Sequence, residues 1–430
     1  MFSDRTNWKL GQNRFTQALE EVRAGGEKVL DLTVSNPTRA GLHYDEAAIL
    51  GALASPRALD YDPQSKGLRE AREAVAGYYR EEHGVRDLDP EQIVLTTSTS
   101  EGYSFVFRLL CNAGDELLVP KPSYPLFEFL ADLQDVRLVP YPLIYDHGWQ
   151  MDFPSLEQAV TERTRGVVVV HPNNPTGSYV QAREFGELDL FCRAHGLALI
   201  VDEVFLDYGL EYFDDKPRTK SNPRSPSASS GQALHAPLDR HPPAQWLGRD
   251  DRGMEHGSFA GNPDVLTFTL SGLSKVAALP QMKVAWVVTS GPRELMAAAM
   301  GRLEVIADTY LSMNAPIQWA MPALLQQREK IQRQLMERVR TNLAELDRQL
   351  AGQGACQRLS VEGGWYAVLR VPVTRSDEEL AIELVREKLV VVHPGHFYDF
   401  PVDGYLVLSL ITAPADFAKG ISAVLGKLNS

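Results

Sequence analysis

Short apolar runs alternate with longer amphipathic stretches from Glu91 to Thr289. This alternation indicates strands that are each followed by a helix, the pattern of a mostly parallel sheet covered by helices. Several runs are apolar throughout, as expected for strands buried on both faces. We therefore predict an α/β fold with a large seven-stranded sheet, whose strands lie at residues 93–96, 116–119, 136–139, 166–170, 198–201, 266–270 and 284–288.

A second, smaller unit follows. A long charged stretch with helical periodicity covers residues 315–353, and apolar runs follow it at 366–371, 390–393 and 406–411. We predict that these runs form a small α+β domain behind one long connecting helix. The expected boundaries are an N-terminal segment at 1–50 that packs with the small domain, a large domain at 51–300, and the helix with the small domain at 301–430.

The segment 213–256 breaks this pattern because it is rich in proline, serine, arginine, histidine and aspartate. Such a composition buries too little apolar surface to offset the entropy cost of ordering the chain. We interpret the segment as a surface insertion in the large domain. Both a dispensable loop and a lid or contact role are open for it.

Bulk properties narrow the class of protein. The formal net charge of −13 argues against nucleic acid or an anionic membrane as a partner, because both require basic patches. No run of about 18 apolar residues and no apolar signal sequence is present, so we expect neither a membrane span nor secretion. Cys111, Cys192 and Cys356 are far apart, which favours free thiols in a cytoplasmic protein. No His/Cys cluster suggests a metal site.

Lys275 follows the apolar run 265–270 in a small, hydroxyl-rich turn. Desolvation at the end of a buried strand lowers the pKa of a lysine and leaves a neutral amine, which can condense with an aldehyde to form a Schiff base. A solvated end-cap is the more common role of a lysine at such a position. The interpretation of Lys275 therefore depends on the rest of the chain.

Two further segments have polar residues where an apolar run ends. The turn Asn173-Asn174-Pro175-Thr176-Gly177 comes soon after the run 166–170, and Asp202 follows the run 198–201. Ligands of open α/β sheets bind at these carboxyl ends of the strands. Taken singly, the first segment is an ordinary turn and Asp202 is equally explained as a helix N-cap.

In this order the motifs resemble the signature of the class I/II aminotransferases, which are fold-type I pyridoxal-phosphate enzymes. The matching stretches are Asn174-Pro175-Thr176-Gly177, Val201-Asp202-Glu203-Val204 and Gly272-Leu273-Ser274-Lys275. The resemblance covers about residues 28–428, apart from the insertion. It implies pyridoxal 5′-phosphate as cofactor and Lys275 as its Schiff-base residue. It also implies that Asp202 pairs with the pyridine nitrogen and keeps it protonated, so that the ring acts as an electron sink.

The resemblance assigns further residues to the cofactor. Asn174 matches the donor to the phenolic oxygen, Tyr124 matches the aromatic residue that stacks on the ring, and Ser274 belongs to the turn that carries the lysine. Tyr61 matches a tyrosine that reaches the phosphate of the neighbouring subunit. This last match implies a homodimer with shared active sites.

A phosphate site is expected at Thr97, Ser98 and Thr99, which join an apolar run to an amphipathic stretch. Hydroxyls and backbone N–H groups at a helix N-terminus form a good anion site. The family often has glycine where Ser98 stands, although hydroxyl-rich caps also occur at helix starts of any kind.

Two departures from the family pattern concern the cofactor. The family usually has a phosphate-binding arginine where this chain has Lys283, so the charge is kept but the bidentate fork is lost. The family also usually has a tyrosine, a donor to the phenolic oxygen, where this chain has Phe205. We expect the Schiff base to keep its proton to a higher pH than in a Phe205→Tyr variant.

A third departure concerns the substrate. The arginine that binds the substrate α-carboxylate in the family is replaced by Val407. A charge-assisted hydrogen bond is worth roughly 1.5–3 kcal/mol, so its loss weakens binding by one to several powers of ten. Either another group binds the carboxylate or the substrate has none. Arg39, which follows Asn36 in a segment that lines the substrate mouth in the family, is our candidate; the others are Arg370, His393 and His396.

The predicted function is a pyridoxal-phosphate-dependent aminotransferase that moves an amino group between an amino acid or amine and a 2-oxo acid, with Lys275 and Asp202 as catalytic residues. A lyase or decarboxylase of the same fold uses the same carbanion chemistry and is the first alternative. A non-catalytic effector-binding homologue is the second. No stretch that resembles a DNA-binding domain precedes the core.

Overall fold

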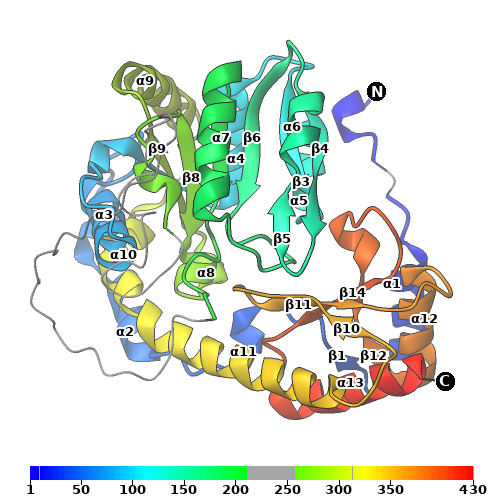
Figure 1. Ribbon diagram of the computed structural model, residues 1–430. Helices are drawn as coiled ribbons and strands as arrows, with labels where there is room; N and C mark the ends of the chain where they lie inside the picture. The colour runs from blue at the N-terminus through cyan, green and yellow to red at the C-terminus, as the bar shows by residue number, and fades with distance from the viewer. Residues whose placement is uncertain (9, 211–256, 312, 430) are drawn as a thin grey trace, which may run out of the picture.

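The structure, a computed structural model, describes residues 1–8, 10–210, 257–311 and 313–429. Its main sheet has eight strands in the order β2-β9-β8-β7-β6-β3-β4-β5 (Figure 1). The strands are β2 (Ile93–Thr96), β3 (Glu116–Lys121), β4 (Arg137–Tyr145), β5 (Trp149–Met151), β6 (Thr164–Val170), β7 (Ala198–Asp202), β8 (Thr267–Gly272) and β9 (Ala285–Ser290). All seven predicted strands are present. The eighth, β5, is a three-residue edge strand that pairs antiparallel with β4.

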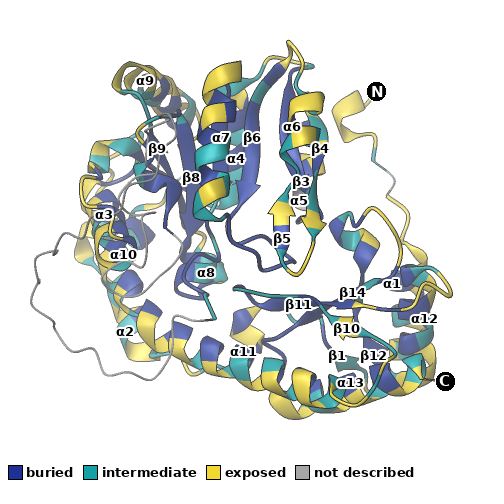
Figure 2. Ribbon diagram, in the orientation of Figure 1, coloured by how far each residue is buried: buried dark blue, intermediate teal, exposed yellow. Residues whose placement is uncertain are grey.

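The middle of this sheet is parallel, because β4, β3, β6, β7 and β8 run in the same direction. Besides the edge strand β5, β9 runs against its neighbours β8 and β2. Most residues of β3, β6, β8 and β9 are buried, whereas most of β4 is intermediate or exposed (Figure 2). The mostly parallel α/β fold predicted from the apolar runs is thus confirmed, and the carboxyl ends of β6, β7 and β8 lie side by side at one edge of the sheet.

Helices cover both faces of the sheet. On one face α4 (Thr99–Leu110), α5 (Leu126–Asp132) and α9 (Arg293–Tyr310) pack on residues such as Val94 and Val287. On the other face lie α6 (Phe153–Ala159) and α7 (Ala182–His195), and beside them α3 (Arg69–His83) and α10 (Ala315–Gln326) pack on Leu95 and Trp286. Neighbouring strand residues therefore point to opposite layers, as the period of two requires.

The smaller unit contains a four-stranded antiparallel sheet in the order β10-β11-β14-β13. Its strands are β10 (Gln357–Arg358), β11 (Tyr366–Arg370), β13 (His393–Pro394) and β14 (Tyr405–Ser409), and a separate parallel pair joins β1 (Leu30–Asp31) to β12 (Val390–Val391). The helices packed on these strands are α1 (Arg14–Ala24), α11 (Arg328–Leu350), α12 (Asp377–Lys388) and α13 (Pro414–Leu428). The N-terminal residues thus contribute β1 and α1 to this unit, whereas α2 (Glu46–Leu53) packs on α10.

The stretch 315–353 is not one helix, as the sequence suggested, but two. It divides at Gln327 into α10 and α11, and α10 contains Pro322. Only α11 reaches the smaller unit, where it packs on α13 (Figure 1). The short 3-10 helices are η1 (Asp4–Thr6), η2 (Pro37–Arg39), η3 (Pro56–Leu59), η4 (Pro90–Gln92), η6 (Phe259–Gly261), η7 (Pro280–Met282) and η8 (Gly395–Tyr398).

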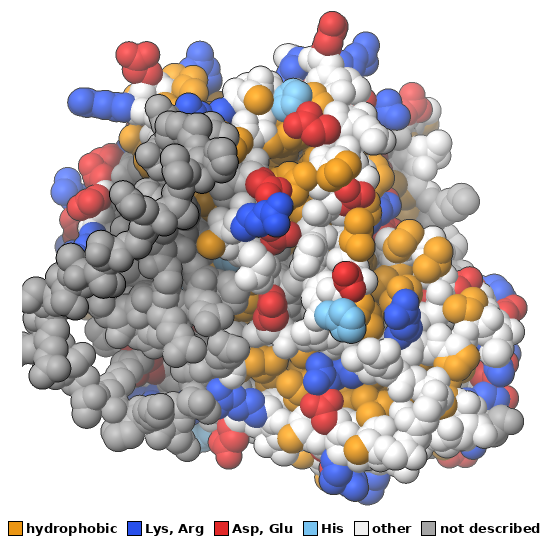
Figure 3. Space-filling view, viewed as in Figure 1, with side chains coloured by type: hydrophobic (Ala, Val, Ile, Leu, Met, Phe, Trp, Pro, Cys, Tyr) orange, Lys and Arg blue, Asp and Glu red, His pale blue; other side chains and the backbone are white. Residues whose placement is uncertain are grey.

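Some of the sequence expectations can be compared only with the residues that the structure describes. The insertion at 213–256 lies outside them. Within them, no helix has the length and apolarity needed to cross a bilayer, no group of His, Cys, Asp and Glu residues could hold a metal ion, and the three cysteines are free. On the face shown in Figure 3, lysine and arginine side chains are interspersed with aspartate and glutamate.

Candidate active site

Lys275 lies on α8 (Leu273–Val276), a single turn that begins directly after β8. Its Nζ atom is 5.0 Å from the centre of the Trp365 ring and 5.5 Å from that of Phe205. Burial lowers the pKa of Lys275 to about 8, and the charge of Asp202 opposes this shift. The chain therefore holds a lysine amine that is partly neutral at physiological pH, as the position after a buried strand suggested.

Asp202 ends β7, next to β8 in the sheet. Its Oδ2 atom accepts a hydrogen bond of 3.0 Å from the Tyr103 hydroxyl, and its Oδ1 atom accepts one of 3.0 Å from the backbone N–H of Val204. Burial raises the pKa of Asp202 to about 6, while these two bonds and the charge of Lys275 lower it. Asp202 is thus a desolvated carboxyl group held by two donors, and a cationic partner would stabilise its charged form.

The turn with Asn174 follows β6 and is fixed by a contact with the smaller unit. The carbonyl oxygen of Gly177 accepts hydrogen bonds from the backbone N–H groups of Glu362 and Gly363, at 3.2 and 2.9 Å. The Asn174 side chain is 9% exposed, and its Oδ1 atom is buried with no partner among the described residues. Because buried amides are normally hydrogen-bonded, Asn174 fits a bound group at this edge of the sheet.

The predicted phosphate site lies where β2 ends and α4 begins. Ser98 is the N-cap of α4 and accepts a hydrogen bond of 3.2 Å from the backbone N–H of Glu101. The Glu101 carboxylate in turn accepts from the backbone N–H of Thr97 at 2.7 Å and from its hydroxyl at 3.1 Å. Ser98 and Thr97 are thus engaged in capping, so the first N–H groups of α4, beginning at Thr99, are those left for an anion.

Tyr124 is 45% exposed and lies near both Asp202 and Tyr366. Burial of its ring and the charge of Asp202 raise the pKa of its hydroxyl. Ser123 joins this corner to the smaller unit through a hydrogen bond of 2.9 Å from its backbone N–H to the carbonyl of Tyr398. Tyr124 therefore lies close enough to Asp202 to sense its charge.

Phe205 and Lys283 are the two positions where this chain differs from the usual family pattern for the cofactor. They differ in burial. Phe205 is 3% exposed and packs on Trp365 with a ring distance of 5.1 Å. Lys283 is exposed, follows η7 and has a left-handed backbone conformation with φ of 53°. The structure thus places Phe205 against Lys275, while Lys283 has no hydrogen-bond partner among the described residues. Ser274 precedes the lysine on α8.

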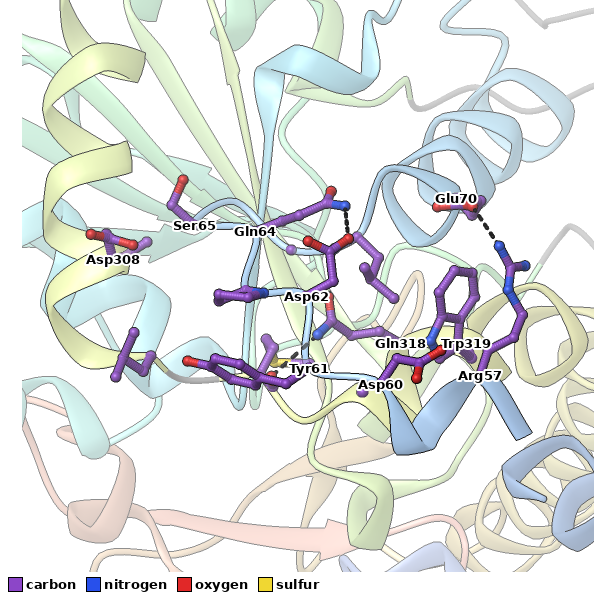
Figure 4. A pocket seen from close by; sticks show the side chains of 17 residues that line it. Arg57, Asp60, Tyr61, Asp62, Gln64, Ser65, Glu70, Asp308, Gln318 and Trp319 are labelled. Atoms are coloured by element: carbon purple, nitrogen blue, oxygen red, sulfur yellow. Dashed lines mark hydrogen bonds and ion pairs between the residues drawn. The ribbon is translucent and has the colours of Figure 1, made fainter. Parts of the chain in front are cut away.

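Tyr61 does not join these residues. It is 82% exposed and lines a separate pocket of about 330 Å³ between the η3–α3 segment and helices α9 and α10 (Figure 4). In the same pocket the Arg57 guanidinium lies 3.7 Å from the centre of the Trp319 ring. Neither Lys275 nor Asp202 lines this pocket. Within one chain, Tyr61 is therefore apart from the cofactor residues.

The expected substrate residues are dispersed over the N-terminal and C-terminal segments. Asn36 caps η2 by accepting from the backbone N–H of Thr38 at 3.0 Å, and Arg39 ends η2 exposed. Val407 is buried in β14, between Val368 of β11 and His393 of β13.

The other candidate cations differ from Arg39 in their surroundings. Burial lowers the pKa of His393 to about 4, and its Nδ1 atom lies 3.1 Å from the Tyr398 hydroxyl, so His393 is neutral at physiological pH. Arg370 is exposed at the end of β11 away from Tyr366. His396 is exposed in η8.

Three residues of the site were not found from the sequence. Tyr103 binds Asp202 from α4, Trp365 covers Lys275 from the start of β11, and Tyr208 donates a hydrogen bond of 2.6 Å to the carbonyl of Lys275. Tyr103 is five residues after Ser98 on the same helix, but no linear motif marks it. Only folding brings Trp365, ninety residues further along the chain, to the lysine.

The fold and this arrangement define a pyridoxal-phosphate enzyme: a lysine after one strand, a buried aspartate at the end of its neighbour and an unpartnered asparagine after the next. Comparison with known families agrees, because the family model for aminotransferase class I and II matches residues 27–411. The chain belongs to this family, whose cofactor is pyridoxal 5′-phosphate.

Individual relatives support the same assignment. Over 302 residues the chain is 30% identical to the glutamate-pyruvate aminotransferase AlaA of Escherichia coli K12, a match that covers 70% of this chain and 64% of the relative. It is 26% identical over 425 residues to an alanine aminotransferase of Mycobacterium tuberculosis, covering 96% and 88% of the two chains. An alanine aminotransferase structure from Pyrococcus furiosus has a TM-score of 0.83 at 20% identity and covers each chain completely. This last likeness shows the fold.

Proposed function

We propose that the protein is an aminotransferase that moves an amino group between an amino acid and a 2-oxo acid, with Lys275 as the cofactor-bearing lysine. The observation that carries the proposal is the environment of Lys275: its amine lies against Phe205 and Trp365, and its pKa is lowered to about 8 beside the Asp202 carboxylate. An amine of this pKa is nucleophilic near neutral pH and serves as a general base.

Each residue has a task that follows from its position. The bound cofactor supplies the electron sink for the electrons of the substrate Cα–H bond. Asp202, held by Tyr103, pairs with the ring nitrogen and keeps it charged. Asn174 would donate to the ring's oxygen through its amide nitrogen, Tyr124 would stack on the ring, and Thr99 with the start of α4 would bind the phosphate. The Lys275 amine would accept the α-proton of the substrate and return it.

Two observations bear on the substrates: the names of the relatives, and the replacement of the carboxylate-binding arginine by Val407. The relatives are named as glutamate-pyruvate and alanine aminotransferases, which suggests small or acidic amino acids as donors. Val407 cannot bind a carboxylate, so we assign this role to Arg39, an exposed cation with no ion pair among the described residues. Loss of a charge-assisted bond costs about 1.5–3 kcal/mol, so Arg39→Ala should raise the KM for the best amino donor about tenfold or more.

The assignment of Arg39 has a matched control. Arg370 is also exposed and belongs to the smaller unit, but it lies at the other end of β11 from Tyr366. Arg370→Ala should leave the KM unchanged. An unchanged KM in Arg39→Ala would show that another group binds the carboxylate.

The active unit is proposed to be a homodimer in the cytoplasm. Tyr61 is 82% exposed and lines a pocket that includes neither Lys275 nor Asp202, which supports a role in the site of a second subunit. Three free cysteines support a reducing compartment.

Absorbance spectroscopy of the purified protein tests the reaction class. Addition of glutamate or alanine should convert the bound cofactor to its amine form, and a 2-oxo acid should restore the original spectrum. Turnover of the amino acid without this conversion would indicate a lyase or decarboxylase instead. A spectrum that no amino acid changes would indicate a binding protein.

A further inference from the structure

Three backbone carbonyls around Lys275 are held by side chains from remote parts of the chain. The Tyr208 hydroxyl donates to the Lys275 carbonyl at 2.6 Å, the Gln332 side-chain amide to the Val276 carbonyl at 2.7 Å, and the Tyr44 hydroxyl to the Ala278 carbonyl at 2.9 Å. The Lys275 carbonyl also accepts from the backbone N–H of Ala278 at 3.1 Å. Because α8 is a single turn that ends here, the Val276 and Ala278 carbonyls depend on the side-chain donors. The backbone that carries the lysine is therefore fixed from outside.

Gln332 has a special position among these three side chains. Its amide nitrogen donates to the Val276 carbonyl and also to Oδ2 of Asp207, both at 2.7 Å. An amide nitrogen carries two hydrogens, so each acceptor receives one. Both neighbours are acceptors only, which fixes the orientation of the amide. Gln332 is 6% exposed and has no freedom to exchange these partners for water.

Asp207 is held in place independently of Gln332. It is 8% exposed, and its Oδ1 atom accepts a hydrogen bond of 2.9 Å from the Tyr78 hydroxyl. The Nε2 atom of His83 lies 2.9 Å from both Asp207 Oδ1 and the Tyr78 oxygen. A buried carboxylate requires such donors to offset its lost hydration. Asp207 is thus a fixed hydrogen-bond acceptor that directs the Gln332 amide toward the lysine backbone.

Gln332 also connects two parts of the molecule. It lies in the second turn of α11, the helix that runs from α10 to α13 of the smaller unit (Figure 1). Its two acceptors belong to the segment after β7 and to the segment after β8. The amide is therefore the point at which the connecting helix contacts the lysine backbone through a hydrogen bond.

We propose that Gln332, directed by Asp207, is a positioning residue that sets the place of the Lys275 amine. The proposal rests on the proposed role of Lys275. Removal of the amide leaves the Val276 carbonyl without its donor and lets α8 shift. A displacement on the order of 1 Å of a reacting group costs up to about a hundredfold in rate.

The test measures the lysine itself in cofactor-free protein. Pyridoxal phosphate is added to the apo-protein, and its attachment is followed by absorbance and trapped with borohydride, after which the labelled peptide is identified. Gln332→Met, which keeps the volume and removes the amide, should slow attachment per folded molecule by about ten- to a hundredfold. In the holoenzyme kcat should fall while KM is kept.

Two variants separate positioning from folding. Gln349→Met removes a comparable bond of the same helix, 2.9 Å from its amide to the Ala418 carbonyl, and should leave the attachment rate unchanged. Tyr208→Phe keeps the ring against Trp365 and removes only the donor to the Lys275 carbonyl, so it should slow attachment even where Gln332→Met fails to fold.

Attachment rates in Gln332→Met and Tyr208→Phe equal to that of the wild type would overturn the inference. A wild-type label on any lysine other than Lys275 would instead overturn the proposed function, so the two failures are distinguishable.

Discussion

At the scale of single residues, burial acts on Lys275 and Asp202 in opposite directions. The pKa of the lysine falls to about 8 and that of the aspartate rises to about 6, because desolvation disfavours the charged form of each. Their mutual attraction only partly offsets this cost. The burial that makes the Lys275 amine reactive therefore also lowers the stability of the cofactor-free protein.

This cost predicts a pH-dependent gain in stability when the lysine is removed. Below pH 8 the folded protein contains a buried ammonium, so cofactor-free Lys275→Met should be more stable than the wild type, by on the order of 3 kcal/mol. The folded pKa lies below the unfolded one, so the difference should shrink as the pH rises from 8 toward 10.5. Urea unfolding of the two proteins at pH 7 and pH 10 measures it. A gain that is equal at both pH values would contradict the assignment.

Phe205 allows a second prediction at this scale. Its buried ring lies 5.5 Å from the Lys275 amine, so a hydroxyl added in Phe205→Tyr lies near the lysine–cofactor linkage. A donor to the cofactor's phenolic oxygen stabilises the deprotonated linkage and should lower its pKa by about one unit, since a hydrogen bond contributes about 1 kcal/mol. Spectrophotometric titration of both holoenzymes is the measurement. Identical midpoints would show that Phe205 does not face that oxygen.

At the scale of elements, the site is assembled by turns that follow neighbouring parallel strands. β6, β7 and β8 each lead into one functional residue, and their pairing in the sheet sets the spacing between Asn174, Asp202 and Lys275. The turn after β6 is further fixed by its contact with residues 361–363, just before β11. A change at this contact therefore acts on the site and on the packing of the two units.

Gly177 is the position where this contact tolerates no side chain. Its φ is 71°, and an added Cβ would lie 2.4 Å from Val361 Cγ2 and 2.5 Å from the Gly363 carbonyl oxygen. Gly177→Ala should destabilise the protein by about 1–3 kcal/mol and weaken cofactor binding. Gly186 in α7 is the control, because a Cβ there meets nothing within 4 Å and alanine should stabilise the helix by about 0.5–1 kcal/mol. Thermal unfolding of both variants tests the contrast, and equal melting temperatures would contradict it.

At the scale of the whole molecule, one chain does not bring together all the residues that we propose for the cofactor. Tyr61 is 82% exposed, and the pocket that it lines (Figure 4) does not include Lys275. A dimer in which each subunit offers Tyr61 to the other would complete both sites. Loss of one bond to a charged phosphate costs about 1.5–3 kcal/mol, so Tyr61→Ala should weaken cofactor binding about tenfold or more.

Mixed dimers test whether the sites are shared. Co-expression of Lys275→Ala chains with Tyr61→Ala chains should give heterodimers with one intact site, which binds the cofactor with wild-type affinity. If Tyr61 served its own chain, every site with Lys275 would lack Tyr61 and the weak binding would persist. Titration of purified heterodimers with pyridoxal phosphate distinguishes the two cases.

The sequence alone determined the parallel sheet and the positions of Lys275, Asp202 and Asn174 on it. Apolar runs buried on both faces specify strands, and polar residues directly after them must meet at one sheet edge. The short strands β1, β5 and β10 were missed, because two or three residues carry no periodicity. The division of 315–353 into α10 and α11 was missed as well, since the helical pattern continues through Gln327.

Only the tertiary structure decided what surrounds the lysine. Trp365, Tyr103, Tyr208 and Gln332 reach the site from four separate segments. No local pattern links them to it, because their contacts span 56 to 99 residues of sequence. The structure also showed that Ser98 and Thr97 are engaged by Glu101, and that Val407 is buried while Arg39 is exposed. The local sequence was thus enough to single out Lys275. Its pKa and the position of its amine depend on burial and on hydrogen bonds that form only when distant segments pack.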